Sequence, residues 1–216
     1  MQLQEQDRTF IASRVAALEA RTGAQVLVAA VGKSDSYPEA PWKAFALGSA
    51  AMALACVAWQ AGAGNWAAAG SRFGHALAML AAGALLALLA VLCPGFARLF
   101  TDRTRREVET SQFAQSLFYR HGLDRTRGRT GILLLVSLFE RRVVVLADAG
   151  FDGRVGAADW QALTARMTFI LGRGAVAGAL RAGLDALEAL LLERGFADGA
   201  GGTMPPAVVL DIAEAG

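Results

Sequence analysis

Two carboxylates in the glycine-containing stretch "LADAGFDGR" are the residues of this sequence best suited to hold a cation. Asp148 and Asp152 follow a valine- and leucine-rich run, and oxygen ligands are what Ca²⁺ and Mg²⁺ prefer. Glu19 and Asp159 could join such a site if the fold brings them near. The alternative is turn chemistry, in which Asp and Gly only shape the backbone. The sequence therefore predicts either a calcium or magnesium site at Asp148 and Asp152, or a plain turn.

Other metal and cofactor chemistry has no matching pattern in the sequence. His75 and His121 have no second His or Cys at the spacing of zinc ligands, and Cys56 and Cys93 lie in apolar runs. There is no nucleophile elbow, phosphate loop or dinucleotide fingerprint. The glycines of "LGRGAVAG" precede no Lys-Ser or Lys-Thr pair, so they indicate a turn between helices. The net charge of +2 gives no reason to expect a nucleic-acid partner.

Arginines form the second group of residues with functional potential. One cluster directly follows an apolar run and consists of Arg98, Arg103, Arg105 and Arg106. Because a basic residue near an anionic membrane surface contributes about 1 kcal/mol, we expect these four to contact anionic lipid. A second set lies in or beside the loop "HGLDRTRGRTG" and consists of Arg120, Arg125, Arg127 and Arg129. This set either meets phosphate or anionic headgroups, or it belongs to an ordinary solvated loop.

Two long apolar runs would position the first arginine cluster at a membrane. The chain of 216 residues is 55% hydrophobic and only 19% charged. Residues 42–63 contain no charge after Lys43, and residues 73–97 contain no Asp, Glu, Lys or Arg. A membrane span needs about 20 apolar residues, and a soluble helix of that length would need a polar face. We therefore predict a transmembrane helical hairpin, with a hairpin buried in a soluble protein as the alternative.

Small residues, tryptophans and flanking charges are consistent with this hairpin. The small residues that would let the two backbones approach are Gly48, Ala51, Ala55, Gly83 and Ala87, and the interfacial tryptophans are Trp42, Trp59 and Trp66. Lys43 and the first arginine cluster flank the hairpin, whereas the connecting loop holds only Arg72. The positive-inside rule therefore predicts that both termini lie in the cytoplasm.

Residues 131–150, "GILLLVSLFERRVVVLADAG", are long enough to be a third span. However, Glu140, Arg141 and Arg142 would lie near the bilayer midplane, at a cost of about 2.5 to 3.5 kcal/mol for a charged residue there. Two strands joined by a tight polar turn fit better, because valine and leucine favour strands and continuous apolar runs suit a sheet covered on both faces. We predict a β-hairpin here.

The remaining elements complete an α/β pattern. We expect a helix over residues 4–22 that ends at Gly23, and then a buried strand over residues 24–31. After the apolar runs, a Thr104-x-x-Glu107 capping box starts a helix that stops at Gly122. Two further helices are expected, from about Asp159 to Leu171 and from about residue 175 to Gly195.

Several of these stretches resemble the TPM domain family, whose founding members are a thylakoid lumen protein, a photosystem II repair protein and a nematode receptor modulator. The resemblance is carried by "EARTGAQ", by "GILLLVSLFERRVVVLAD" and by "AGFDGRV" followed by Trp160, and it covers roughly residues 8–195. It is strongest to bacterial membrane members, in which two spans interrupt the domain after its first strand. The resemblance implies an α/β/α sandwich, and it implies acid phosphatase activity or calcium binding in some members and modulation of membrane partners in others.

The resulting prediction is an α/β/α sandwich of TPM type interrupted by a transmembrane helical hairpin. Its parts are residues 1–40 and 99–196 for the domain, 41–98 for the hairpin and 197–216 for a flexible tail. We expect a multi-pass protein of the bacterial inner membrane whose cytoplasmic domain binds or modulates membrane-protein partners or serves envelope maintenance. The alternative is a metal-dependent phosphatase that uses Asp148 and Asp152.

Overall fold

The computed structural model describes residues 5–34, 37–63, 69–197 and 208–212 of the chain. The chain forms two compact units. One unit combines Met1–Ser36 with Glu107–Gly216, and the other is Tyr37–Arg106. The first unit thus consists of two segments that are separated in the sequence by the second unit.

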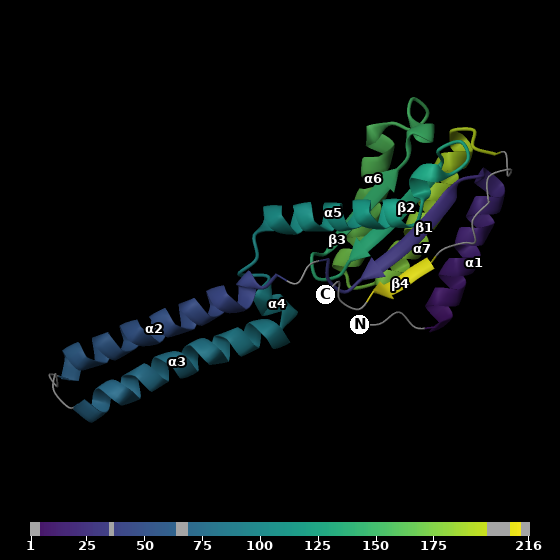
Figure 1. The fold of residues 1–216 in the computed structure, drawn as a ribbon. Coiled ribbons are helices and arrows are strands. Elements are labelled where there is room, and N and C mark those ends of the chain that lie inside the picture. Colours follow the sequence, from purple (N-terminus) through teal and green to yellow (C-terminus); the bar gives the residue numbers. More distant parts are fainter. Residues whose placement is uncertain (1–4, 35–36, 64–68, 198–207, 213–216) are drawn as a thin grey trace. The chain divides into compact units, whose positions relative to one another are not determined.

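A mixed sheet lies at the centre of the first unit (Figure 1). Its strands are β1 (Gln25–Val31), β2 (Gly131–Ser137), β3 (Arg142–Ala147) and β4 (Val208–Ile212), and their order in the sheet is β3-β2-β1-β4. Strand β1 runs parallel to β2 and β4, whereas β2 and β3 are antiparallel. All residues of β1 and β2 are buried, as their continuous apolar sequences predicted. The α/β class is therefore confirmed.

Helices cover both faces of this sheet (Figure 1). Helices α1 (Glu5–Thr22), α6 (Ala157–Gly172) and α7 (Val176–Glu193) lie on one face, and α5 (Arg103–Arg120) lies on the other. Successive residues of a strand point to opposite faces, so Val26 and Val28 enter the first core while Leu27 and Ala29 enter the second. Two short 3-10 helices, η1 (Leu123–Arg125) and η2 (Ala149–Phe151), adjoin the sheet.

The predicted hairpin over residues 131–150 is confirmed. Ile132 pairs with Ala147 and Ser137 pairs with Arg142, so the charged centre of the stretch forms the connection between the strands. Glu140 is buried there and accepts hydrogen bonds from the Ser137 hydroxyl and from the backbone N–H of Ser34, the latter at 2.9 Å. The charges that exclude a membrane span are therefore used to connect two strands.

The start of α5 differs from the predicted capping box. Asp102, not Thr104, caps the helix, because the backbone N–H of Thr104 donates to Asp102 Oδ1 at 3.2 Å. Glu107 instead forms an ion pair with Arg142 of β3. The capping-box prediction is therefore wrong, since an acidic N-cap two residues earlier satisfies the same helix end. The predicted stop is confirmed, because Gly122 follows α5 with a φ of +66°.

The C-terminal part of the chain also differs from the predicted flexible tail of residues 197–216. Residues 208–212 form β4, in which Val208 pairs with Val28 and Val209 pairs with Ala29 of β1. The pentapeptide "VVLDI" is rich in β-branched residues, which favour strands, and it adds a parallel edge to the sheet. Residues 198–207 and 213–216 lie outside the described residues.

The second unit is an antiparallel pair of long apolar helices, α2 (Glu39–Ala63) and α3 (Ala69–Leu92), followed by the short α4 (Pro94–Ala97). Both long helices are of sufficient length and apolarity to cross a membrane. The predicted second run reached residue 97, but α3 ends at Leu92 because Pro94 begins a new helical turn. Trp42 and Trp59 are exposed, and Trp66 lies outside the described residues.

The two long helices approach closely at two of the predicted small residues. A Cβ atom added to Gly48 would lie 2.6 Å from the backbone oxygen of Ala82, and one added to Gly83 would lie 2.3 Å from the Ser49 hydroxyl. At Gly48 the neighbouring atoms are backbone and include the Cα of Gly83 at 3.0 Å, so a larger residue there would require the helices to shift, whereas at Gly83 the neighbouring atoms are side chains of Ser49 and Phe45. Close backbone approach at Gly48 and Gly83 is therefore confirmed.

Candidate functional site

The most constrained charged group near the predicted metal site is the Asp148 carboxylate. Asp148 directly follows β3 and caps η2, and its side chain is 5% exposed. Oδ1 accepts hydrogen bonds from Arg129 Nη2 at 2.7 Å and from the backbone N–H of Ala149 at 2.8 Å. Arg129 Nε lies 3.1 Å and 3.2 Å from the two carboxylate oxygens. This two-pronged contact is the strong form of an Arg–carboxylate pair.

The hairpin register brings this pair together. Because Ile132 lies opposite Ala147, the residues just before β2 meet the residues just after β3. The backbone N–H of Gly150 donates to the Arg129 carbonyl at 2.9 Å, and a Cβ atom at position 150 would lie only 2.5 Å from that carbonyl oxygen. Glycine at position 150 therefore permits the close approach of the two loops.

The pKa of Asp148 lies below its ordinary value as a result of opposing effects. Burial acts to raise this pKa, but the hydrogen bonds from Arg129 and Ala149 and the positive charge of Arg129 together outweigh burial. The carboxylate is therefore ionised at neutral pH and is already bound to a cationic side chain.

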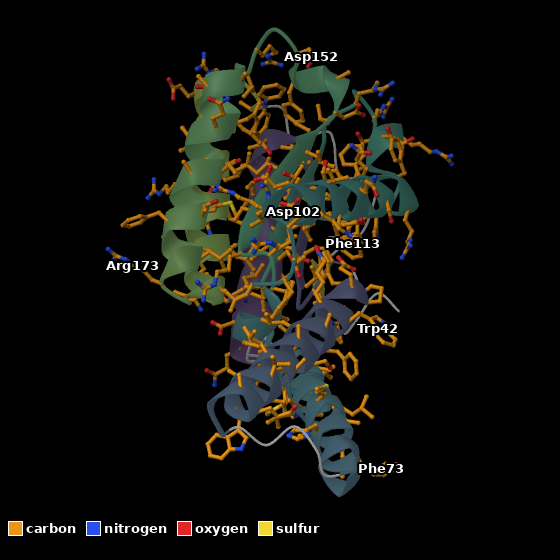
Figure 2. The ribbon with its side chains drawn as sticks, turned by 90° about the vertical axis from the view of Figure 1, so that its left-hand side faces the viewer. Trp42, Phe73, Asp102, Phe113, Asp152 and Arg173 are labelled. Carbon is orange, nitrogen blue, oxygen red and sulfur yellow. The ribbon has the colours of Figure 1, made fainter. Side chains whose placement is uncertain are left out.

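The other carboxylates of the predicted cation site have separate surroundings. Asp152 lies in the loop at the top of Figure 2, and its side chain has no ion pair or hydrogen bond among the described residues. Asp159 accepts from the backbone N–H of Gly156 at 3.0 Å and forms an ion pair with Arg194 at 2.8 Å. Asp148 and Asp159 therefore pair with different arginines, and Asp152 pairs with none among the described residues.

Glu19, the remaining carboxylate of the predicted cation site, lies in the last turn of α1. Its Oε1 accepts hydrogen bonds from Gln25 Nε2 and from the backbone N–H of Val26, both at 2.8 Å. Burial raises the pKa of Glu19, and the hydrogen bond from Val26 only partly opposes this effect. Glu19 thus joins α1 to the start of β1 rather than to Asp148.

Within the ranges that the structure describes, no group of three or more His, Cys, Asp and Glu side chains is arranged to hold a metal ion. A calcium or magnesium site at Asp148 and Asp152 remains a prediction. Any cation there would compete with the Arg129 guanidinium for the Asp148 oxygens.

The predicted lipid-contacting arginines all belong to the second unit, which ends at Arg106. Arg98 directly follows α4, and Arg105 forms an ion pair with Glu39 at 3.2 Å. Lys43 near the start of α2 donates to the backbone oxygen of Phe100 at 3.0 Å. Lipid contact by Arg98, Arg103, Arg105 and Arg106 remains a prediction.

Sequence reasoning missed the pairing of Arg129 with Asp148 and assigned the two residues to different candidate sites. The available signal was the predicted hairpin itself, because its register continues past the strands and places Arg129 opposite Gly150, diagonally across from Asp148. Sequence reasoning also missed the buried group at the turn, where the Ser34 and Ser137 hydroxyls lie 3.0 Å apart beside Glu140.

We predict that Arg129→Gln lowers the stability of the protein most above about pH 4, the ordinary pKa range of Asp. A carboxylate with a lowered pKa contributes stability above its unfolded-state pKa and loses it as the pH falls through the folded-state pKa. The difference in unfolding temperature between wild type and variant should therefore shrink on acidification. Thermal unfolding of the detergent-solubilised chain measures this, with Arg166→Gln on the exposed side of α6 as the charge-matched control. A pH-independent difference would contradict the assignment.

Comparison with known proteins supports the resemblance seen in the sequence. The family described as the TPM domain matches residues 97–190, which include α5, β2, β3 and α6 and most of α7. No curated protein matches the chain. The chain is similar in fold to the NMR structure of BA42 protein from the psychrophilic bacterium Bizionia argentinensis, with a TM-score of 0.55 and 12% identity over 96% of this chain and 94% of that one. The resemblance to the TPM domain family is confirmed over residues 97–190 of this chain.

Proposed function

We propose that the α2–α3 hairpin anchors the protein in the bacterial inner membrane. On this proposal an α/β/α sandwich of TPM type lies in the cytoplasm and binds or modulates membrane-protein partners or serves envelope maintenance. The observation that carries the proposal is the apolar exterior of the hairpin. Only 11% of each apolar helix window is buried, so the helices are not the core of a soluble domain.

The exposed apolar side chains of the hairpin occur on both long helices. They include Leu47, Leu54 and Val57 of α2, and Leu77, Leu80, Leu85, Leu88 and Val91 of α3. A soluble monomer rarely exposes a continuous apolar surface of this kind, whereas a lipid bilayer covers it. Two helices provide two crossings, each near the length of about 20 residues that a bilayer requires.

Strand pairing in the first unit supports the proposed topology. β1 precedes the hairpin in the chain, β2 follows it, and the two strands are adjacent in one sheet. Both ends of the inserted hairpin must therefore lie on the same side of any membrane that it crosses. Lys43 and the arginine cluster of Arg98, Arg103, Arg105 and Arg106 favour the cytoplasm as that side.

The exposed side of α6 supports a binding role. A shallow hollow of about 580 Å³ there is lined by Trp160, Gln161, Thr164, Ala165, Thr168 and Phe169. Phe169 is 64% exposed, and the Arg173 guanidinium lies 4.5 Å from its ring centroid. Figure 2 shows Arg173 projecting outward from this helical layer. Aromatic residues and arginine are enriched at protein interfaces, so we assign the partner-binding surface to this part of α6.

A metal-dependent phosphatase is the second candidate. It is favoured by the ionised state of Asp148 and by the exposed Asp152 side chain, and the tight contact of Asp148 with Arg129 counts against it. The two candidates differ in whether the domain turns over a phosphate ester in a metal-dependent way.

We predict that the hairpin crosses the bilayer twice and that the protein therefore stays in the membrane when peripheral proteins are washed away. Reporter fusions in the connection at residues 64–68 and at the C-terminus should report opposite sides, whereas fusions at the N- and C-termini should report the same side. Sodium carbonate washing should leave the full chain in the membrane fraction. Equal signals from the connection and the C-terminus would rule out the hairpin topology.

We expect a photoreactive phenylalanine analogue at position 169 to cross-link a membrane protein in native membranes. The same analogue at position 119 of α5 is the control, because Tyr119 is also exposed, at 65%, but lies on a different helix. Adducts that form equally at both positions, or at neither, would contradict a binding surface on α6.

The phosphatase candidate predicts turnover of a generic phosphate ester by the purified protein that depends on added Mg²⁺ or Ca²⁺. Asp152→Asn is the informative variant, since Asp152 makes no described side-chain contact and its loss should leave the fold intact. A role in metal or acid–base chemistry predicts a decrease in kcat of about 100-fold or more. Turnover that is absent, or unchanged in Asp148→Asn and Asp152→Asn, would eliminate this candidate.

A further inference from the structure

The contact between α2 and α3 carries a cysteine, a histidine and a methionine, which are Cys56, His75 and Met79. All three side chains are half-buried, whereas residues beside them in the sequence, such as Ala55 and Val57, are exposed. In a pair of helices, a half-buried residue between exposed neighbours faces the other helix. The three side chains therefore point into the contact between α2 and α3.

The closest approach of the two helices sets the height of these residues along the helix axes. A Cβ atom added to Gly48 would lie 3.0 Å from the Cα of Gly83, so positions 48 and 83 lie at the same height. Cys56 lies eight residues after Gly48, and His75 lies eight residues before Gly83. Because an α-helix rises about 1.5 Å per residue and the helices are antiparallel, both lie about 12 Å from this approach, in the same direction (Figure 1). Cys56 and His75 are therefore at the same height, and Met79 is about one turn away.

The contacts of His75 agree with this register. Gln60 Nε2 lies 3.4 Å from His75 Nδ1 and 3.5 Å from His75 Nε2, so the imidazole ring reaches α2 one turn beyond Cys56. Both distances exceed those of an ordinary hydrogen bond, and a neutral imidazole has one nitrogen with a free lone pair. Long side chains of a helix point toward its N-terminus, so Met79 is directed toward Cys56 and His75. A thiol, a thioether and an imidazole nitrogen thus come to one part of the helix contact.

We propose that Cys56, His75 and Met79 bind a Cu(I) ion. The sulfur atoms of cysteine and methionine are soft ligands that select Cu(I), and imidazole also suits copper. Three such ligands with no carboxylate among them differ from the four ligands that a structural zinc ion takes. The thiol of Cys56 releases its proton to solvent when the ion binds, since the thiolate is the metal ligand.

The apolar surroundings favour a monovalent ion. Residues 44–63 and 73–92 contain no Asp, Glu, Lys or Arg. A net charge is costly in such surroundings. The charges of Cu⁺ and one thiolate cancel, whereas Zn²⁺, Ca²⁺ or Mg²⁺ with the same thiolate would leave a net positive charge. The site uses neither Asp148 nor the exposed side of α6, so this proposal stands independently of the partner-binding and phosphatase candidates.

The test is a competition for Cu(I) between the full chain, purified in detergent under anaerobic and reducing conditions, and the coloured chelator bicinchoninate. Wild type should withdraw one equivalent of Cu(I) per chain from the chelator. Loss of an outer-shell partner alone costs about 10- to 100-fold in metal affinity, so Cys56→Ser and His75→Asn should each weaken Cu(I) binding by about 100-fold or more. Met79→Leu keeps the side-chain volume but removes the thioether, and it should weaken binding by about tenfold.

The chain contains one further cysteine and one further histidine, which provide matched controls. Cys93 is exposed and directly follows α3, and His121 directly follows α5 in the other unit. Because substitutions away from a site usually have small effects, Cys93→Ser and His121→Asn should leave the Cu(I) affinity within about twofold of wild type. Unfolding temperatures without copper show whether each variant keeps its fold.

X-ray absorption at the copper edge identifies the ligands directly in wild type, even if a variant does not fold. The spectrum should show sulfur and nitrogen neighbours, and the nitrogen neighbour should be absent in His75→Asn. The proposal is overturned if wild type does not compete for one equivalent of Cu(I), or if the bound copper has no sulfur neighbour. It is also overturned if Cys93→Ser weakens Cu(I) binding as much as Cys56→Ser does.

Discussion

The parallel pairing of β1 with β2 is the contact on which the rest of the domain depends. Residues 32–130 lie between these strands in the chain, and yet Gln25 to Val31 pair in register with Gly131 to Ser137. Loop-closure entropy grows slowly, by about 0.6 kcal/mol for each doubling of loop length, so a long insertion is thermodynamically tolerable. The strands offset this cost because every residue of both is buried between helical layers. This one pairing therefore joins the two halves of the sheet and requires the chain to return to β1 after the inserted hairpin.

Two buried carboxylates beside this sheet are held by specific hydrogen-bond donors. Asp148 is held by Arg129 at one end of the β2–β3 hairpin, and Glu140 is held by serine and backbone donors at the other. A buried carboxylate without such donors would destabilise the fold, because no hydrogen bonds would replace those that it makes to water in the unfolded chain. The carboxylate that first suggested a cation site is thus explained as an anchor for the end of the hairpin. Arg127 and Arg154, which have no carboxylate partner among the described residues, line a different pocket.

Three apolar segments of similar composition have different roles in this molecule. The stretch of residues 131–150 contains charges at its centre, and therefore it folds back as two strands. The segments of α2 and α3 have no such interruption and remain single helices, with glycines at their contact and leucines on their exterior. The position of a few charges, rather than overall hydrophobicity, distinguishes the sheet core from the membrane-length helices.

The sequence by itself determined the order of the long helices and of β1, β2 and β3, the hairpin and its turn, and the two membrane-length helices, because these depend on local patterns of apolar residues, glycines and charges. It did not determine that residues 208–212 add an edge strand, because that strand forms only by pairing with β1. It also did not determine that Asp102 caps α5, because two nearby residues could each cap this helix. The tertiary structure alone showed that Asp148 binds Arg129 and that Glu19 and Asp159 bind other groups. It also brought Arg127 and Arg154 to one pocket from separate loops. The physical reason is that side-chain partners are chosen by distances in the folded chain, to which sequence spacing is a guide only within one hairpin or one helix.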